Sequence, residues 1–377
     1  MILVDYSSVI HRKIYSAIVS MAPGKDENGK FITEEFIDYA KFEIVNELFK
    51  ISQEFSPRFG EIVICLDNKS AEGYWRKDVF NAYKATRSKD RQESDINFST
   101  VWPEINKVTE AIIKFLPWRT IEVHRAEADD IILILAEEFA KYNPVLDYSK
   151  PELLIHSPDK DMIQSQIGND IIHQFSALTN KWILPDSKSE SMDQWILEHI
   201  CLGDVSDNVP KIVDRTEFTD KFIKYLSDNS IECECPVKFK KMDISIQEKI
   251  NLIEKYDIYY LNRAGEPQEK EIYKKMRFGP ATLNKTIAKF GDLDSFLDSN
   301  HQYRENYERN KILVLTEGIP SYIRENTLKE FKEAETEYKR QEFEEFVKEN
   351  NIGSLLLEIP PSISSKLGEL TAEDFGW

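Results

Sequence analysis

The sequence has no long apolar run, and its first residues do not have the pattern expected of a secretory leader. None of its apolar stretches approaches the roughly 18 residues that a membrane-spanning helix needs. The N-terminal residues MILVDYSS include neither the basic segment nor the small-residue cleavage site of a signal peptide. We therefore expect a cytoplasmic protein that does not act at a membrane.

Cysteine is also scarce, and the four cysteines do not form a metal-binding pattern. Only Cys233 and Cys235 lie close together, as CEC, whereas Cys65 and Cys201 occur singly in apolar runs. A zinc site needs four ligands at set spacings. We therefore expect reduced thiols, which agrees with a cytoplasmic setting.

The chain is short of positive charge. Lys and Arg total 49 against 67 Asp and Glu, which gives a net charge of −18. Taken alone, this balance argues against a nucleic-acid partner, because a polyanion is repelled by like charge. The argument loses its force if the acids gather at a metal site and the bases gather elsewhere, and both patterns occur in this sequence.

The first half of the chain alternates strand-like and helical patterns. With 377 residues, of which 41% are hydrophobic, the chain is long enough for two or three folded domains. Alternation of strands and helices predicts an α/β domain with a mostly parallel sheet. The expected strands are residues 2–7, 61–67, 120–126, 152–161 and 170–175, and the expected helices are 33–52, 101–115, 127–142, 193–202, two within 278–297, and 329–350.

Acidic residues follow several of these expected strands. Asp5, Asp67, Asp159 and Asp161 all lie at the C-terminal end of a strand-like run, and in open α/β sheets that edge binds ligands. Two like charges about 4 Å apart repel by about 4 kcal/mol at an effective dielectric constant near 20. Converging carboxylates therefore imply a cation.

The complete acidic set contains nine carboxylates and no paired histidine or cysteine. Oxygen ligands suit Mg²⁺ or Mn²⁺, and nine exceed the needs of one ion, so two ions and phosphodiester hydrolysis are expected. Each motif alone has a structural explanation: acids at a helix start, a DxD turn, or an Asx turn. Their joint occurrence favours the metal site, and the members are Asp5, Asp67, Glu127, Asp129, Asp130, Asp159, Asp161, Asp204 and Asp207.

Two further segments suggest contacts with phosphates. YWRKDVFNAYKATRSKDR (74–91) gathers six bases among aromatic residues, and on a helix that starts near Trp75, Lys77, Lys84 and Arg87 would share one face. A solvated helix with scattered charges is the alternative. In FGPATLNKTIAKFG (278–291), a glycine before a helix would offer free amides to a phosphate; the alternative is an ordinary glycine-capped hairpin.

In these motifs the sequence resembles the 5′-nuclease superfamily, which includes flap endonucleases, and in particular the T-even phage ribonuclease H group. The matching pieces occur in the order typical of that family: VDYSS, CLDN, WRKDVFNAYKATR, RAEADDI, SPDKDMIQ, GDVSDNVPKI and FGPATLNKTIAKFG. The resemblance implies a PIN-like α/β nuclease domain followed by a helix–three-turn–helix region that grips duplex DNA.

The resemblance also implies roles for individual residues. Asp5, Asp67, Glu127, Asp129, Asp130 and Asp159 would surround the first ion, and Asp161, Asp204 and Asp207 the second, with Asp129 and Asp159 central to catalysis. Lys84 and Arg87 would stabilise the transition state at the scissile phosphate. Nucleic acid would also be contacted by Tyr83, which stacks on the terminal base, by Arg76 and Lys77 in a single-strand channel, and by Gly279, Lys285 and Lys289 at the duplex backbone.

These expectations define a function and its partners. They describe a Mg²⁺-dependent 5′–3′ exonuclease and flap endonuclease, with Mn²⁺ as a substitute, that acts on flapped or nicked DNA and on RNA–DNA hybrids. Its setting would be primer removal in a phage-infected cell, with a sliding clamp and a single-strand-binding protein as candidate partners. A non-cleaving branched-DNA-binding protein and another magnesium phosphoryl-transfer enzyme are the alternatives; the intact acidic set argues against the first, and the basic segment and glycine hairpin against the second.

The expected domains are 1–200 (nuclease), 201–328 (duplex binding, with an insertion at about 211–275) and 329–377 (a charged helical extension). The insertion departs from the family pattern, because about 65 residues separate Pro210 from Arg277. The C-terminal residues ELTAEDFGW are consistent with a partner-binding tail or with a frayed terminus.

Overall fold

The computed structural model describes residues 1–85, 87, 93–142, 151–184, 192–213, 278–334 and 336–354, and only the backbone of four short strands between 216 and 275. Cys233, Cys235, most of the expected insertion and the C-terminal tail lie outside these residues. The chain forms two compact units: unit 1 contains Met1–Gln194 and Ile312–Trp377, and unit 2 contains Trp195–Lys311. These limits differ from the motif-based boundaries at 200 and 328, because the chain returns to unit 1 after Lys311.

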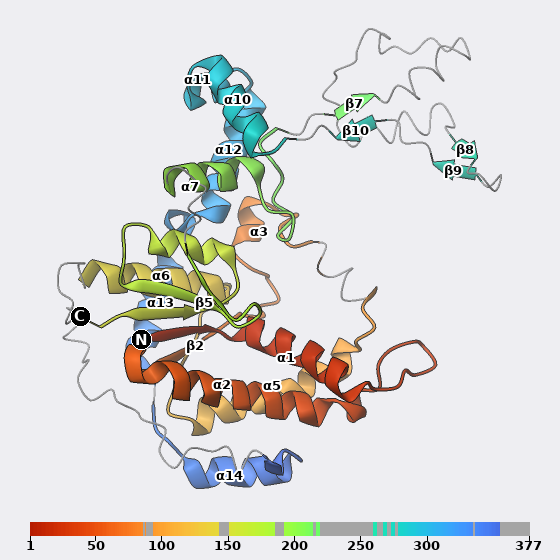
Figure 1. Cartoon of the computed structure of the whole chain (residues 1–377), viewed down its shortest axis with the longest axis vertical. Coiled ribbons are helices and arrows are strands. Elements are labelled where there is room, and N and C mark those ends of the chain that lie inside the picture. The colour runs from red at the N-terminus through yellow and green to blue at the C-terminus, as the bar shows by residue number, and fades with distance from the viewer. Residues whose placement is uncertain are drawn as a thin grey trace. The chain divides into compact units, whose positions relative to one another are not determined.

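A six-stranded sheet forms the centre of unit 1 (Figure 1), in the order β3-β2-β1-β4-β5-β6. All neighbouring strands are parallel except β5 and β6, which confirms the predicted mostly parallel α/β fold. The strands are β1 (Ile2–Asp5), β2 (Ile62–Leu66), β3 (Arg119–Glu122), β4 (Leu153–His156), β5 (Ile172–Ser176) and β6 (Lys181–Ile183). The antiparallel edge strand β6 is not among the predicted strands.

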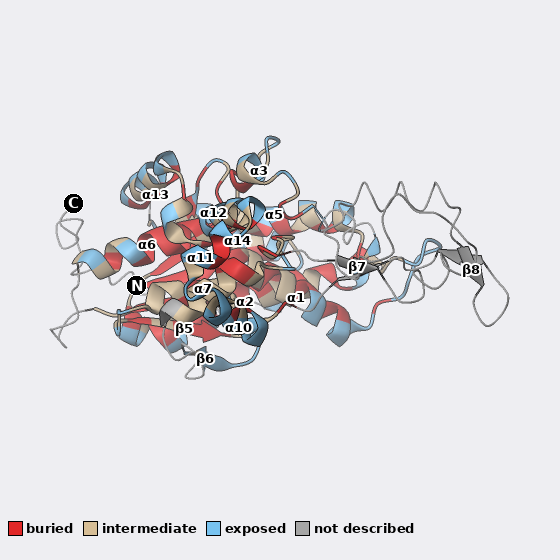
Figure 2. Cartoon of the chain, turned by 90° about the horizontal axis from the view of Figure 1, so that it is seen from above, coloured by how far each residue is buried: buried red, intermediate tan, exposed pale blue. Residues whose placement is uncertain are grey.

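Helices cover both faces of this sheet. Because strand side chains alternate between faces, Val4 points to one core and Leu3 to the other. The first core is closed by α1 (Tyr6–Met21), α2 (Ile37–Phe59) and α5 (Phe98–Phe115), and the second by α6 (Ala128–Tyr142) and α13 (Ser321–Glu333). In Figure 2, α1 and α6 are drawn largely in red and tan, because most of their residues are buried or half-buried, and the exposed residues of each lie toward its C-terminal end.

Helix α1 is not among the predicted helices, although its cap can be read in the sequence. The Asp5 side chain accepts a hydrogen bond of 3.0 Å from the backbone nitrogen of Ser8, and so acts as the N-cap. A short 3-10 turn, η1 (Thr33–Glu35), precedes α2. The predicted helix 33–52 is therefore present in large part, but it extends further, to Phe59.

Two predicted helices are wrong in their extent. The helix that begins at Trp75 in the prediction ends at Val79 in the structure (α3, Arg76–Val79), and the described residues 81–85 after it are turns in which Lys84 has a φ of 53°. A left-handed residue cannot continue a right-handed helix, so the expected shared face of Lys77, Lys84 and Arg87 does not form. The helix expected at 329–350 is divided into the end of α13 and α14 (Arg340–Glu349), because Ala334 turns to an extended conformation.

Unit 2 has its own small core of helices. They are α7 (Met192–Leu202, which begins in unit 1), α10 (Pro280–Phe290), α11 (Leu293–Asp298) and α12 (His301–Val314, which ends in unit 1). The core residues include Cys201, Leu283 and Phe296. The buried Asn310 amide donates hydrogen bonds to the carbonyls of Ile200 (2.9 Å) and Pro210 (2.8 Å), which joins α12 to the end of α7.

Two strand pairs also belong to unit 2. They are β7 (Thr216–Phe218) with β10 (Tyr273–Lys275), and β8 (Tyr259–Leu261) with β9 (Pro267–Glu269), both antiparallel. Among the described residues, no helix combines the length and the apolar character that crossing a bilayer requires.

Candidate metal and catalytic site

The strand order places a ligand-binding position at the C-terminal end of β1. The order reverses between β1 and β4, with β2 and β3 on one side and β5 on the other. In open α/β sheets, ligands bind outside the carboxyl ends of the strands at such a switch point. Asp5 ends β1, Asp67 follows β2 directly, and Asp159 follows β4 by three residues.

Asp5 is buried beside another carboxylate. The pKa of Asp5 is raised to about 6, mainly by burial and also by the nearby charge of Asp67, and the hydrogen bonds from Ser8 and Ser157 limit the rise. The Ser157 hydroxyl donates to Asp5 over 2.9 Å. Ionisation of Asp5 is therefore costly unless a cation is close.

Asp67 is fixed by groups from two helices. The Ser7 hydroxyl of α1 donates to one carboxylate oxygen over 2.6 Å, and the backbone nitrogen of Ala128 donates to the other over 2.8 Å. The second bond uses a free amide of the first turn of α6, where a negative charge is favourable. Asp67 thus connects the end of β2 with the start of α6.

Asp129, in the first turn of α6, is the least compensated acid of the site. Burial raises its pKa well above the usual value, the charges of Asp159 and Asp5 raise it further, and Lys84 opposes the rise. Among the described residues, no hydrogen bond reaches its carboxylate. Carboxylates that repel one another and offer only oxygen atoms as metal ligands fit a hard divalent cation, Mg²⁺ or Mn²⁺.

Glu127 and Asp130, by contrast, are neutralised by the protein itself. Glu127 accepts hydrogen bonds from Arg76 (3.0 Å) and Tyr83 (2.9 Å) and pairs with Lys84. Asp130 pairs with Arg76 (2.8 Å) and accepts a hydrogen bond from the Trp75 indole (3.0 Å). Both acids are expected metal ligands, but in this structure their carboxylates face protein cations and donors.

The basic segment is divided between buried and exposed residues. Arg76 and Tyr83 are 5% and 3% exposed, so neither offers a surface to nucleic acid in this structure. Lys84 is also buried, whereas Lys77 and Arg87 are exposed. The structure therefore keeps only part of the expected basic surface available to solvent.

Tyr74 is a site residue that sequence reasoning did not identify. Its ring is partly buried, and the Lys84 ammonium lies 5.8 Å from the ring centroid. Burial raises the pKa of Tyr74, the charges of Asp67 and Glu127 raise it further, and Lys84 and Arg87 lower it. Its position next to Trp75 in the aromatic and basic segment is the signal that could have identified it.

Asp159 and Asp161 belong to the turn after β4. Asp159 is the N-cap of the 3-10 helix η2 (Lys160–Gln166), and its carboxylate accepts a hydrogen bond of 2.9 Å from the backbone nitrogen of Asp161. The backbone nitrogen of Asp159 donates to the Ser157 hydroxyl over 3.2 Å. Ser157 therefore contacts both Asp5 and Asp159 and connects two strand ends.

In unit 2, Asp204 and Asp207 lie in a tight loop after α7. Gly203 has a φ of 63°, and a Cβ atom there would lie 2.3 Å from the carbonyl oxygen of Val209, so only glycine fits. Asp204 accepts hydrogen bonds of 2.6 Å from the nitrogen and the hydroxyl of Ser206, so the loop contains the Asx turn that was the structural alternative to a metal site. Although burial opposes ionisation, these bonds lower the pKa of Asp204.

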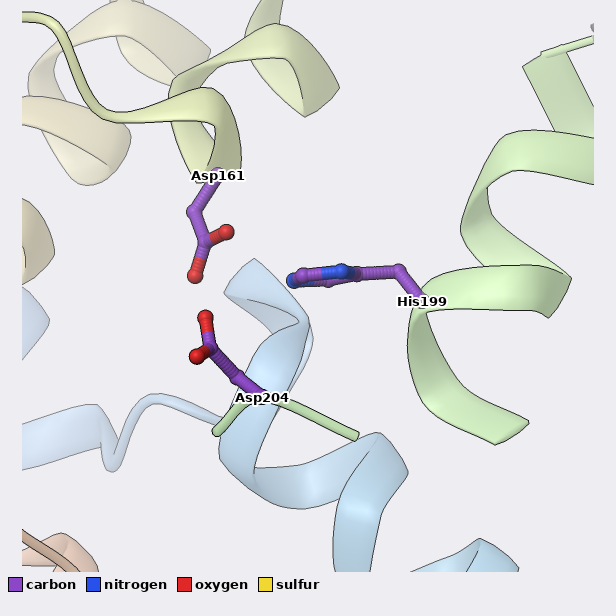
Figure 3. Close-up of side chains that lie close together, drawn as sticks. All are labelled: Asp161, His199 and Asp204. Carbon is purple, nitrogen blue, oxygen red and sulfur yellow. The ribbon is translucent and has the colours of Figure 1, made fainter. Parts of the chain in front are cut away.

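His199 is a second residue that the sequence did not indicate. It lies on α7, and Figure 3 shows its ring directed toward the Asp204 carboxylate. A ring nitrogen of His199 lies within 4.8 Å of an Asp204 oxygen, and the ring stacks on Trp195 with centroids 5.0 Å apart. The Asp161 carboxylate, also drawn in Figure 3, belongs to unit 1.

The glycine hairpin forms as predicted. Gly279 is the N-cap of α10, Gly291 ends α10 with a φ of 97°, and Asp292 caps α11. Lys285 and Lys289 are both exposed, one turn apart on α10. The described part of unit 2 therefore presents a free helix N-terminus and two bases on one helix.

Comparison with known proteins agrees with this fold. Residues 1–192 match the model of the 5′-3′ exonuclease N-terminal resolvase-like domain. Ribonuclease H of Enterobacteria phage T4 is 27% identical over 216 residues, which are 57% of this chain and 64% of that protein. DNA polymerase I of Rhizobium leguminosarum is 32% identical over 143 residues, which are 37% of this chain and 12% of the polymerase. The chain thus spans less than two thirds of either relative.

Solved structures are more distant. A T5 protein co-crystallised with metal ions covers 93% of this chain at 14% identity, with 98% of that chain matched and a TM-score of 0.46. The T5 5′-exonuclease with bound zinc gives the same coverages, 12% identity and a TM-score of 0.44. The family match extends over half of the sequence and over the strand ends that carry Asp5, Asp67 and Asp159. The chain therefore belongs to the 5′–3′ exonuclease family of the 5′-nuclease superfamily.

Proposed function

We propose that this protein is a divalent-cation-dependent 5′ nuclease that hydrolyses phosphodiester bonds near the 5′ ends of DNA and RNA–DNA strands. The observation that carries the proposal is the gathering of Asp5, Asp67, Asp129 and Asp159 around the switch point of the sheet. Such a group of carboxylates is stable in ionised form when divalent cations neutralise it. Membership of the 5′–3′ exonuclease family supports the reaction class.

Two Mg²⁺ ions, with Mn²⁺ as a substitute, are the proposed cofactors. Asp5, Asp67, Asp129 and Asp159 would hold the first, and Asp161, Asp204 and Asp207 the second. Bound there, divalent cations would act as Lewis acids on the phosphate and lower the pKa of water. Glu127 and Asp130 would act indirectly, because their contacts with Arg76 and Trp75 fix the first turn of α6, which carries Asp129.

Basic side chains would stabilise the negative charge that develops on the scissile phosphate. Lys84 lies among the acids in this structure, paired with Glu127, and Arg87 is exposed in the same segment. We assign both to the phosphate, and the exposed Lys77 to the single-stranded part of the substrate. Tyr83 would position Glu127 through its hydroxyl, and the partly exposed Tyr74 would be the ring closest to an incoming base.

Unit 2 would hold the duplex. The N-terminus of α10 at Gly279 offers backbone amides to a phosphate, and Lys285 and Lys289 add positive charge. Contacts of this kind position a duplex without reading its sequence. The substrates would be 5′ flaps, nicks and RNA primers in replication, with a sliding clamp and a single-strand-binding protein as candidate partners.

The proposed function is tested with a 5′-labelled flap duplex and a nicked RNA–DNA hybrid. The wild-type protein should cleave in Mg²⁺ and stop when a chelator is added. Asp159→Asn should lose more than about 100-fold in kcat, because several kcal/mol of transition-state stabilisation depend on the ion. The exposed Asp170→Asn, outside the acid site, is the matched control and should cleave normally. Full cleavage by Asp159→Asn, or cleavage in chelator, would disprove the assignment.

A further inference from the structure

The residues that follow unit 2 in the chain are held by two side chains from the acid-bearing segments. We call residues 313–316 the return segment, because Lys311 is the last residue of unit 2 and the chain then re-enters unit 1. Helix α12 ends at Val314, so its last carbonyl groups have no partner within the helix. Donors for two of these carbonyls come from Arg76 and Gln164.

Arg76 makes the first contact. Its Nε donates to the carbonyl of Leu313 over 2.9 Å, while its two terminal nitrogens bind Glu127 (3.0 Å) and Asp130 (2.8 Å). All three nitrogens of the guanidinium therefore donate to protein oxygen atoms, and the residue is buried. A movement of the Leu313 carbonyl would be transmitted through this planar group to the first turn of α6, where Asp129 lies.

Gln164 makes the second contact, from the other side of the site. Its amide nitrogen donates to the carbonyls of Val314 (3.1 Å) and of Asp161 (2.9 Å). Its amide oxygen accepts from the backbone nitrogen (3.0 Å) and the hydroxyl (2.9 Å) of Thr316. Gln164 lies on η2, whose N-cap is Asp159, so this one side chain connects the return segment with the turn that carries two of the acids.

The fold of the return segment itself is restricted. A Cβ atom on Gly318 would lie 2.0 Å from the carbonyl oxygen of Ile312, so the turn at 312–318 closes only with glycine. Leu313 and Val314 are buried. The segment therefore offers the two side chains a rigid backbone to hold.

From these contacts we propose that Arg76 and Gln164 are positioning residues for catalysis: together they form a clasp on residues 313–316 that fixes the two acid-bearing segments relative to the chain that returns from unit 2. This inference rests on the proposed nuclease function. It gives a role to the glutamine of the SPDKDMIQ motif and a new one to Arg76, which the sequence assigned to nucleic acid. The clasp acts on turnover rather than on binding, because neither side chain is placed to contact substrate.

The test uses substitutions that remove one group and keep the shape. Gln164→Met removes the amide, and Thr316→Val removes the hydroxyl. The matched control is Thr327→Val, the same change at a buried threonine of α13 whose hydroxyl has no hydrogen-bond partner among the described residues. We expect kcat on the flap duplex to fall by about tenfold in each clasp variant, with KM within about twofold, since small misplacements of catalytic groups slow chemistry.

The double variant Gln164→Met/Thr316→Val should be no slower than the slower single variant, because both changes open the same contact. Arg76→Lys keeps the positive charge beside Glu127 and Asp130 but loses the planar guanidinium that binds three groups at once. It should therefore lower kcat by more than the Gln164 and Thr316 variants do. If Arg76→Lys does not fold, the kinetics of the Gln164 and Thr316 variants still test the proposal. Normal kcat in both of these variants, or a loss confined to KM, would overturn the proposal.

Amide hydrogen exchange of the full-length protein gives a readout that does not depend on activity. Gln164→Met should speed exchange at the Thr316 amide, which it binds, and also at the Asp161 amide, which binds Asp159. Faster exchange at Thr316 with no change at Asp161 would mean that the contact only caps α12, and would reject the clasp. If the wild-type protein does not cleave, the proposed function is wrong. The exchange rates would still show whether Gln164 couples the return segment to the turn that carries Asp159 and Asp161.

Discussion

Lys84 combines a buried position, an ion pair and an unusual backbone conformation. Its φ of 53° is a conformation that costs a non-glycine residue on the order of 1 kcal/mol. Its ammonium pairs with Glu127 and opposes the rise in the pKa of Asp129. Strain of this kind persists where the surroundings fix it, which is common at functional sites.

We therefore predict that Lys84→Ala lowers kcat by about 100-fold, about 3 kcal/mol in the barrier, since one charge-stabilising donor is lost. KM should change little, and the protein should remain folded because Arg76 and Tyr83 still bind Glu127. Steady-state kinetics on the flap duplex measures both constants. Lys107→Ala, an exposed lysine on α5, is the control. An unchanged kcat with a raised KM would remove Lys84 from the chemical step.

Asp5 makes the stability of the metal-free protein depend on pH. Its pKa rises from 3.8 in the unfolded chain to about 6 on folding, so the folded state binds the proton more tightly. The stability of the metal-free protein therefore falls as the pH rises from about 4 to about 6, and the full cost remains above that range.

Asp5→Asn should remove this cost and keep the N-cap of α1, since asparagine also caps helices. In chelator at pH 8, we expect the free energy of unfolding to increase by on the order of 1–3 kcal/mol. The difference should nearly vanish at about pH 3, below both pKa values, where Asp5 is mostly protonated in both states. Denaturant titrations at the two pH values measure it, and a variant no more stable than the wild type at pH 8 would contradict the electrostatic account.

The sequence could indicate which acids lie at strand ends, but not which carboxylates the protein neutralises itself. Asp5, Asp67 and Asp159 follow buried apolar runs, so their common edge is predictable from strand direction. Glu127 differs, because its partners Arg76 and Tyr83 come from an irregular segment whose path depends on tertiary contacts. Nothing in local spacing determines that these residues point inward.

At the scale of secondary-structure elements, the parallel strands β1–β5 of the central sheet were the most predictable, whereas the short antiparallel strands β6–β10 were not predicted. All five expected strands form, because buried parallel strands are short apolar runs ended by polar residues. Helix extents were less predictable at 74–91, where helical propensity favours a continuous helix and the pairing of Lys84 with Glu127 instead fixes a turn. At 329–350 the abundant charged residues concealed the break after Glu333.

Helix α14 shows how few apolar residues attach a charged helix. Phe343 and Val347 are fully buried, and the Phe343 ring packs edge-on against Phe49 of α2 with centroids 6.2 Å apart. Their spacing of four residues places both on one face. The other residues of α14 are largely polar and exposed.

Phe343→Ala should therefore reduce the free energy of unfolding by about 3–5 kcal/mol, the usual cost of emptying an aromatic core site. Glu345→Ala, on the exposed side of the same helix, should have almost no effect. Denaturant unfolding of both variants measures the difference. A loss below about 1 kcal/mol for Phe343→Ala would show that α14 is not part of the core of unit 1.

At the scale of the whole molecule, the net charge of −18 has to be reconciled with the nucleic-acid substrate that we propose, which is itself a polyanion. Part of the negative charge is gathered at the acid site, where cations would offset it, while Lys77, Arg87, Lys285 and Lys289 are exposed in the basic segment and on α10. Substrate binding would then depend on local positive surfaces and would weaken with salt. The central claim is that the acids of unit 1 are held together as a cation site.

The most direct measurement is anomalous diffraction from crystals grown with Mn²⁺. The account predicts an anomalous peak bounded by the carboxylates of Asp5, Asp129 and Asp159, which weakens strongly in Asp129→Asn. Carboxylates that remain without a peak in ample Mn²⁺, or that turn away from one another into solvent, would contradict it.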